Sequence, residues 1–188
     1  MFFNNLGFQR VKISLYLRQN LNCCLDILNW HYKSFLCLRM DGIIMKTLMS
    51  VAVQEAKQGY SEGGVPVGAV IAEENGDIIS QGHNMHHQNG DPTSHGETQC
   101  VRNAGRRRDW SSLTLVTTLS PCSMCSGMAV LLNFRRVIVG DRKSFDGKTK
   151  WLEEAGIRVV YLDDPECIQL MDKMLLERPE LWAEDIGK

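Results

Sequence analysis

The residues best suited to chemistry lie between His95 and Cys125. His95 and Glu97 form a His-x-Glu pair, and Cys122 and Cys125 belong to a Pro-Cys-x-x-Cys motif. One imidazole and two thiolates can hold Zn²⁺ at three corners of a tetrahedron and leave the fourth corner for water. Zinc lowers the pKa of that water from about 16 to roughly 7, which makes hydroxide available at neutral pH. We therefore expect one Zn²⁺ per chain, bound by His95, Cys122 and Cys125.

Glu97 is the candidate acid and base of this site. It lies two residues from His95, close enough to reach the water without taking a metal position. A carboxylate there can accept the proton of the water and deliver it to a substrate.

The two motif cysteines alone would also fit other sites. A Cys-x-x-Cys pair that follows a strand and opens a helix is typical of thioredoxin-like redox proteins. A structural zinc site would close with a fourth His or Cys. The remaining cysteines are scattered and lack paired spacing; they are Cys23, Cys24, Cys37, Cys100 and Cys167. The His95-x-Glu97 pair upstream therefore favours an open, catalytic zinc site.

Length and composition fit one ordinary soluble globular domain. The chain has 188 residues, 44% hydrophobic residues and a net charge of −1, enough for a single core. It has neither the basic excess of a nucleic-acid-binding protein nor an apolar run that would span a membrane. Thiolate zinc ligands indicate a reducing compartment. We expect a cytoplasmic protein, with a nuclear location left open.

Residues 1–43 differ from the rest of the chain. They are rich in basic residues and have helically spaced apolar positions, with Asp26 as the single acid before Asp41. Such a start is typical of an organelle transit peptide. The alternative is an extension upstream of a functional start at Met40 or Met45. We favour a dispensable extension over residues 1–43, without excluding targeting, and a catalytic domain over residues 44–188.

The first elements of the domain follow from apolar spacing and turn residues. A helix is expected over residues 43–60, then a buried strand over 66–72 and its hairpin partner over 78–82. Residues 83–93 are rich in His, Asn and Gly and read as a loop. Polar side chains in a loop ahead of a metal ligand are candidate substrate contacts.

The metal ligands are expected at two helix starts. Thr93 or Ser94 is the predicted N-cap of a helix that carries His95 and Glu97 in its first turn. A strand over residues 113–119 should lead into a second helix over 122–133. Amide groups at that helix start would stabilise the cysteine thiolates.

An arginine cluster follows the first of these helices, formed by Arg102, Arg106, Arg107 and Arg108. One interpretation of this cluster is a nucleic-acid-binding surface. The adjacent Asp109 and the lack of interleaved aromatic residues favour a solvated face at the negative end of the helix instead.

The alternation of strands and helices predicts the fold. Strands over 136–140 and 157–162 follow by helical crossovers, and Asp164-Pro165 starts a helix that Pro179 ends before a short tail. Crossovers predict parallel pairing, whereas the first two strands form an antiparallel hairpin. We expect a three-layer α/β/α sandwich around a five-stranded mixed sheet.

Residues 45–188 resemble the fungal-type cytosine deaminases, a branch of the cytidine and deoxycytidylate deaminase superfamily. The zinc motif is shared by the whole superfamily, whereas the C-terminal Trp-x-Glu-Asp-Ile-Gly tail is typical of the cytosine branch. The resemblance rests on GYSEGGVPVG at 59–68, GHNM at 82–85, TTLSPCSMC at 117–125 and ERPELWAEDIG at 177–187. It implies the cytidine deaminase-like fold, a homodimer, and hydrolysis of cytosine to uracil and ammonia in pyrimidine salvage.

The resemblance also implies roles for individual residues. Zinc ligands are implied at His95, Cys122 and Cys125, and the proton shuttle at Glu97. Asn84 and Asp185 would hydrogen-bond the pyrimidine edges. The rest of the implied substrate site comprises the backbone of Gly96 and Ser120, the aromatic walls Phe145 and Trp182, and the pocket residues Val67 and Leu119. His87 stands where the family has an aromatic pocket residue.

Two other functions stay open. A tRNA-editing adenosine deaminase shares the V-P-V-G-A-V and P-C-x-M-C patterns but would need a basic surface that follows the RNA. A catalytically silent deaminase-like binding protein would not need a proton shuttle such as Glu97. An acidic tail that encloses the substrate favours a free base over a polynucleotide.

Overall fold

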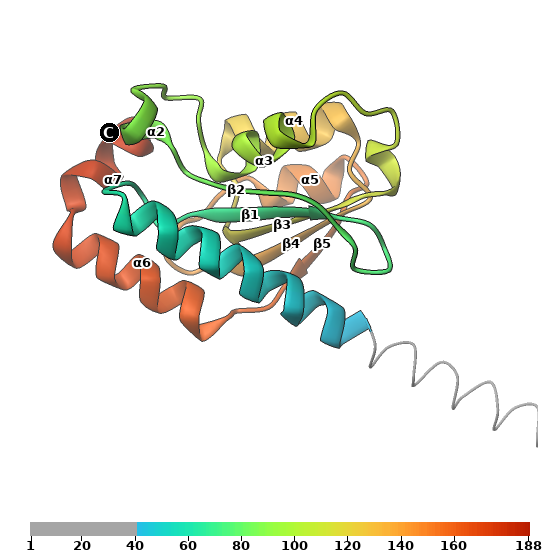
Figure 1. The fold of residues 1–188 in the computed structure, drawn as a ribbon, viewed down its shortest axis with the longest axis horizontal. Helices are drawn as coiled ribbons and strands as arrows, with labels where there is room; N and C mark the ends of the chain where they lie inside the picture. The colour runs from blue at the N-terminus through green and yellow to red at the C-terminus, as the bar shows by residue number, and fades with distance from the viewer. Residues whose placement is uncertain (1–40) are drawn as a thin grey trace, which may run out of the picture. The chain divides into compact units, whose positions relative to one another are not determined.

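The computed structural model of the protein describes residues 41–188, of which 44–188 form one compact unit. The predicted N-terminal extension lies almost wholly outside the described residues. Figure 1 shows the described part as a central sheet between two layers of helices.

The sheet has five strands in the order β2-β1-β3-β4-β5. β1 pairs antiparallel with β2 and β3, whereas β4 pairs parallel with β3 and β5. The strand bounds are Gly68–Ala72, Ile78–His83, Thr114–Leu119, Arg136–Asp141 and Arg158–Tyr161 for β1 to β5. Hairpin and crossover connections thus give the predicted mixed sheet.

Helices cover both faces of the sheet (Figure 1). One face carries the helix over residues 41–61 together with α6, Pro165–Glu177. The other face carries α3, α4 and α5, at Gly96–Ala104, Ser123–Leu132 and Thr149–Glu154. The three central strands β1, β3 and β4 are buried along their whole length, as expected for strands covered on both sides. The predicted α/β/α sandwich is confirmed.

The helix over residues 41–61 packs directly on the first strand. A Cβ at Gly68 would lie 2.1 Å from the carbonyl oxygen of Ala52, so only glycine allows this approach of helix and strand. On its other side, the same helix contacts α6 through a Lys57–Glu166 ion pair and a Tyr60–Glu177 hydrogen bond. In this layer, Met171 and Met174 of α6 pack in one buried cluster with Val67, just before β1, and Leu119, at the end of β3.

Two short helices differ from the prediction. The expected loop over residues 83–93 contains one helical turn, α2, at His86–Asn89, which ends at Gly90 with a φ of 62°. The expected tail over 181–187 is mostly a helix, α7, at Pro179–Asp185. Proline is well suited to the first turn of a helix, so Pro179 stops α6 and also starts α7. Both short helices lie next to the metal-ligand motif, as described below.

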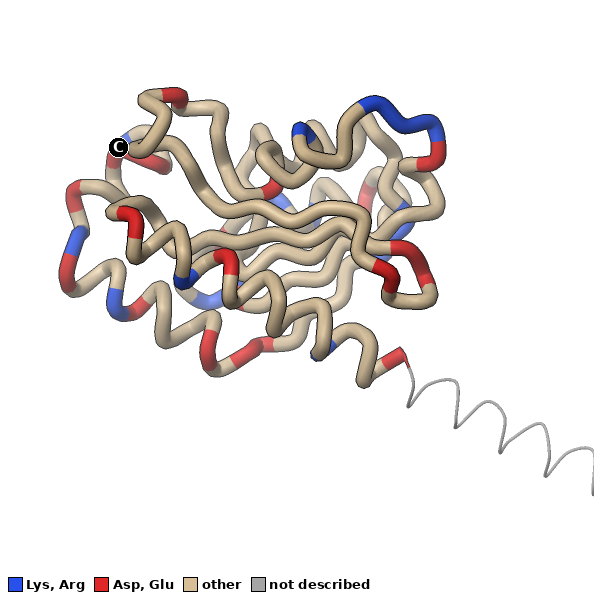
Figure 2. The backbone as a smooth tube through the Cα atoms, viewed as in Figure 1, with Lys and Arg blue, Asp and Glu red and all other residues tan. Residues whose placement is uncertain are grey.

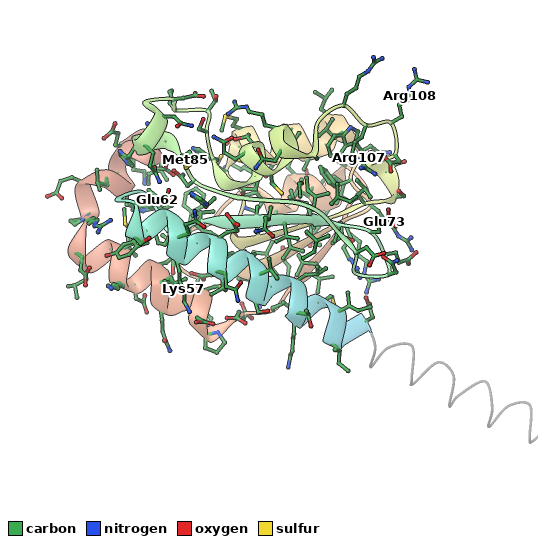
Figure 3. The ribbon with its side chains drawn as sticks, in the orientation of Figure 1. Lys57, Glu62, Glu73, Met85, Arg107 and Arg108 are labelled. Carbon is green, nitrogen blue, oxygen red and sulfur yellow. The ribbon has the colours of Figure 1, made fainter. Side chains whose placement is uncertain are left out.

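Arg102 lies in the last turn of α3, and the other three members of the arginine cluster follow in the loop after it, where Figure 2 shows a run of basic residues. Arg107 forms a two-pronged ion pair with Asp109, with N–O distances of 3.0 and 2.6 Å. Arg108 points away from the body of the protein (Figure 3). Among the described residues, no helix combines the length and the apolar character needed to cross a bilayer.

Candidate active site

Two helix starts bring the metal-ligand motif together. His95 is the N-cap residue of α3, and Cys122 is the N-cap residue of α4. The predicted cap at Thr93 or Ser94 is therefore wrong by one or two residues. Neither His95 nor Cys122 caps its helix with its side chain, because both side chains turn toward each other.

Asp91 organises the turn before His95 in place of the expected cap. Its carboxylate accepts hydrogen bonds from the Thr93 backbone and hydroxyl and from the Ser94 hydroxyl, at 2.8, 2.7 and 2.8 Å. These bonds, led by the Thr93 hydroxyl, lower the pKa of Asp91 to about 2. The hydroxyl groups that could have capped α3 are thus occupied, and the turn presents His95 at a fixed position.

The three predicted ligand atoms have the separation that zinc requires. His95 Nδ1 lies 3.5 Å from Cys122 Sγ and 3.7 Å from Cys125 Sγ. A tetrahedral Zn²⁺ with Zn–N of about 2.0 Å and Zn–S of about 2.3 Å would hold nitrogen and sulfur about 3.5 Å apart. The donor set and its spacing therefore fit zinc with three protein ligands.

Cys122 and His95 stabilise charge on each other, whereas Cys125 is held as a thiol. A hydrogen bond from the Cys125 thiol, opposed by burial and helped by His95, lowers the pKa of Cys122 to about 4. Burial opposes charge on His95, but its bond to Cys122 and nearby acidic groups raise its pKa to about 9. The hydrogen bond to Cys122 and burial raise the pKa of Cys125. Of the two motif cysteines, Cys122 is therefore the more readily deprotonated. A bound cation would also favour loss of the thiol proton of Cys125.

Glu97 lies beside the ligands and is almost fully buried, with 3% of its surface exposed. Burial, followed by the negative charge of Cys122, raises the pKa of its carboxyl. A carboxyl group with a raised pKa is better matched to taking up and releasing protons near neutral pH.

The predicted site residues surround one inner cavity. Its lining includes eleven residues: Val67, Asn84, His95, Glu97, Leu119, Ser120, Cys122, Phe145, Trp182, Asp185 and Ile186. Of the predicted site residues, Gly96 and Cys125 are not on its wall. Cys125 is fully buried beneath it, and Gly96 packs so closely that a Cβ would lie 2.8 Å from the Val67 carbonyl oxygen. The Ser120 backbone N–H donates to the Asp141 carbonyl oxygen at 2.8 Å, which ties this wall of the cavity to the end of β4.

Helix α7 closes this cavity. Trp182 is 8% exposed and meets Phe145 edge to face, with ring centroids 5.4 Å apart. The inner cavity has a volume of only about 20 Å³, roughly the room that one water needs. A larger outer hollow of about 290 Å³ shares five lining residues with it, namely His95, Cys122, Phe145, Asp185 and Ile186. The outer hollow thus reaches two of the predicted metal ligands, whereas a ring-sized ligand would fit inside the inner cavity only if its walls, which include α7, move apart.

Asn84 and Asp185 form the polar end of the cavity. The Asn84 side-chain amide donates to Asp185 Oδ1 at 2.8 Å, while Asn84 Oδ1 accepts the backbone N–H of His86 at 3.0 Å. These bonds fix which end of the amide is NH₂. Asp185 Oδ2 lies on the side of His95, 3.9 Å from its Nε2. The wall thus presents an N–H donor next to a carboxylate acceptor.

His86 is the contact that the sequence did not reveal, and His87, expected at a pocket position, lies behind it. His86 Nδ1 lies 3.2 Å from Asp185 Oδ1. His87 does not line the cavity; its ring stacks on that of His86, with centroids 4.9 Å apart. The only signal for this arrangement was the richness of residues 83–93 in polar side chains before a metal ligand.

Comparison with known proteins identifies the family. Residues 44–141 match the family described as the cytidine and deoxycytidylate deaminase zinc-binding region. The chain is 44% identical over 142 residues to a cytosine deaminase of Candida albicans, which covers 74% of this chain and 95% of that protein. The chain therefore belongs to the cytidine and deoxycytidylate deaminase family, in its fungal-type cytosine deaminase branch.

More distant relatives act on RNA. A tRNA-specific adenosine deaminase of Aquifex aeolicus is 43% identical over 93 residues, which span 48% of this chain and 61% of that protein. A solved structure from a study of A-to-I editing by tRNA:A34 deaminases has a TM-score of 0.58 at 25% identity, covering 66% of this chain and 99% of that one. These matches agree with the fold, and their shorter alignments leave out more of this chain.

Replacing Cys125 with alanine should remove most of the zinc from the purified protein, because two ligands hold the ion far less tightly than three. Metal analysis of protein purified without chelator measures this directly. Cys100→Ala is the matched control, since Cys100 is buried but bonds to Ser80 rather than to the ligand cluster. Full zinc content in Cys125→Ala would show that this cysteine is not a ligand.

Proposed function

We propose that the protein hydrolyses free cytosine to uracil and ammonia, with one Zn²⁺ per chain held by His95, Cys122 and Cys125. The choice of cytosine as the substrate rests on the hydrogen-bond donor and acceptor at the polar end of the cavity, Asn84 and Asp185. An Asn84 N–H beside Asp185 Oδ2 is complementary to the C2 carbonyl and N1–H of free cytosine. In cytidine, N1 carries the sugar and cannot donate.

The protein residues divide the chemistry among them. A bound Zn²⁺ would supply a water that is acidic at neutral pH. Glu97 would carry the first proton of that water to the pyrimidine ring nitrogen and the second to the departing amine. The water oxygen would bond to the ring carbon that bears the amine, and the carbon–nitrogen bond would break to release ammonia. Phe145 and Trp182 stack around the ring, and Val67 and Leu119 complete the apolar wall. The backbone of Gly96 and the Ser120 carbonyl hold the amine end.

The two alternatives are less well supported. A polynucleotide cannot pass beneath α7 while Trp182 and Asp185 close the cavity, which favours a free base over tRNA. A silent binding protein would have no use for a buried carboxyl such as Glu97 beside the ligand cluster. Activity on tRNA or the lack of any deaminase activity would each contradict our proposal.

We also propose an oligomeric state, a location and a metabolic role. The outer face of α4 and α5 exposes apolar side chains, among them Leu131 at 84% and Trp151 at 44%, which supports a homodimer through this face. Thiolate ligands support a reducing, cytoplasmic location and a role in pyrimidine salvage. We propose no nucleic-acid partner.

The test is an assay of zinc-loaded protein on cytosine, guanine and a tRNA substrate, with ammonia release as the common readout. Cytosine should be deaminated far faster than the other two. Faster release from tRNA would favour the adenosine deaminase alternative, and faster release from guanine would mean that the polar pair reads a purine edge.

Deleting residues 1–40 should leave zinc content and cytosine turnover unchanged. The described domain retains its buried helix face, including Leu48, Ala52 and Ala56, and among the described residues the lining of the inner cavity begins at Val67. Comparing the full chain and the truncated chain by metal analysis and kcat/KM checks this. A folded but inactive truncated protein would mean that the extension contributes to the site.

A further inference from the structure

His86 lies at the first position of α2 and is 8% exposed. Its Nδ1 atom is 3.2 Å from Asp185 Oδ1, the same oxygen that accepts the Asn84 amide at 2.8 Å. The second oxygen, Oδ2, faces His95 instead. The two carboxylate oxygens therefore differ. Oδ1 is fixed by two hydrogen-bond donors, whereas Oδ2 faces the predicted metal site.

A carboxylate oxygen can only accept, so His86 Nδ1 must carry the proton. The opposite side of the ring is also held. His86 Nε2 lies 3.8 Å from Glu184 Oε1, and the ring stacks on His87 with an angle of 7° between planes. The imidazole thus has both its orientation and its tautomer set by contacts with the C-terminal helix and its own neighbour.

His86 also touches the other half of the polar pair. Its backbone N–H donates to Asn84 Oδ1 at 3.0 Å, which turns the amide nitrogen toward Asp185. One residue therefore orients the amide with its main chain and the carboxylate with its side chain. Asn84, His86 and Asp185 thus each contact the other two, although His86 and Asp185 lie 99 positions apart in the chain.

We propose that His86 is a positioning residue that aims Asp185 Oδ2 at the N1–H of the substrate. This inference rests on the proposed cytosine deaminase function. Without the imidazole donor the carboxylate can rotate about its side-chain bonds, and α7 loses one of its polar contacts with α2. Loss of an orienting partner behind a functional side chain typically costs about 10–100-fold in activity.

The test compares His86→Leu with His86→Asn. Asparagine can place an N–H where Nδ1 was, whereas leucine keeps bulk without a donor. We expect His86→Leu to lower kcat/KM for cytosine by about 10–100-fold, mostly through KM, and His86→Asn to restore most of the loss. In an Asp185→Ala background, His86→Leu should cost little more. Zinc content and thermal unfolding should match the parent protein.

Two results would overturn the inference. The first is a His86→Leu variant with the kcat/KM of the parent protein. The second is a His86→Asn variant as impaired as His86→Leu, with both variants folded and loaded with zinc, which would mean that the imidazole ring acts by packing. The ¹⁵N spectrum of His86 gives a readout that needs no turnover: Nδ1 should be protonated in the parent protein and should shift in Asp185→Ala. If the parent protein does not deaminate cytosine, the proposed function fails, whereas this spectrum still decides the tautomer and its dependence on Asp185. An unprotonated Nδ1 would refute the positioning role.

Discussion

Glu97→Gln should lower kcat for cytosine by about 10²–10⁴-fold, the usual loss when a positioned acid and base is removed. Glutamine has nearly the same shape as glutamate but cannot carry protons between the water and the ring. The side chain is 3% exposed and lies on the cavity wall, so bulk water has little access to replace it. Steady-state kinetics with an ammonia assay measures the loss.

Zinc content separates this effect from damage to the site. Glu97 is not among the three ligand atoms that lie within zinc distance of one another, so the glutamine variant should retain its zinc. Near-normal turnover in a zinc-loaded Glu97→Gln protein would mean that another group carries the protons. Loss of zinc would instead mean that Glu97 helps to bind the ion.

Cytosine should be preferred over cytidine by roughly 10⁴–10⁵-fold in kcat/KM, as in sites built around a hydrogen bond that an analogue cannot make. Asp185 can accept from N1–H of the free base, whereas the ribose of cytidine occupies that position and meets α7. Competition between the two substrates in one reaction measures the ratio. Similar rates on both would contradict the closed cavity as the source of specificity.

Two substitutions at Asp185 sharpen this test. Asp185→Ala removes the acceptor and should lower kcat/KM for cytosine sharply without changing zinc content. Asp185→Asn should have a kcat/KM for cytosine as low as that of Asp185→Ala. The donors from Asn84 and His86 would hold its amide oxygen, so its NH₂ group would face the N1–H of the substrate. A variant Asp185→Asn with parental kinetics would show that the acceptor is not used.

The sheet and the ligand cluster were predictable because local patterns determine them. Capping residues and turns placed His95 and Cys122 at two helix starts, and the zinc motif predicted that their side chains meet. The zinc motif also has few other chemical uses. The described structure brings these atoms to 3.5 Å, in agreement with that reasoning.

The short helices and their contacts were not predictable from the sequence alone. α2 has four residues and α7 has seven, below the length at which a helix is stable by itself. They exist through tertiary contacts such as that of Trp182 with Phe145. Helical periodicity cannot show that His86 meets Asp185, and the Asp91 hydrogen bonds overrode the capping preference of Ser94.

The modest anchoring of α7 has a consequence for every binding measurement on this protein. Trp182 is the only residue of that helix that is buried, so its detachment is a local opening that costs less than global unfolding. When only a fraction of molecules has the binding-competent arrangement, the apparent Kd equals the intrinsic Kd divided by that fraction. Affinity for a base should therefore vary with temperature and denaturant well below the melting transition, and amide hydrogen exchange in α7 should slow when a base is bound.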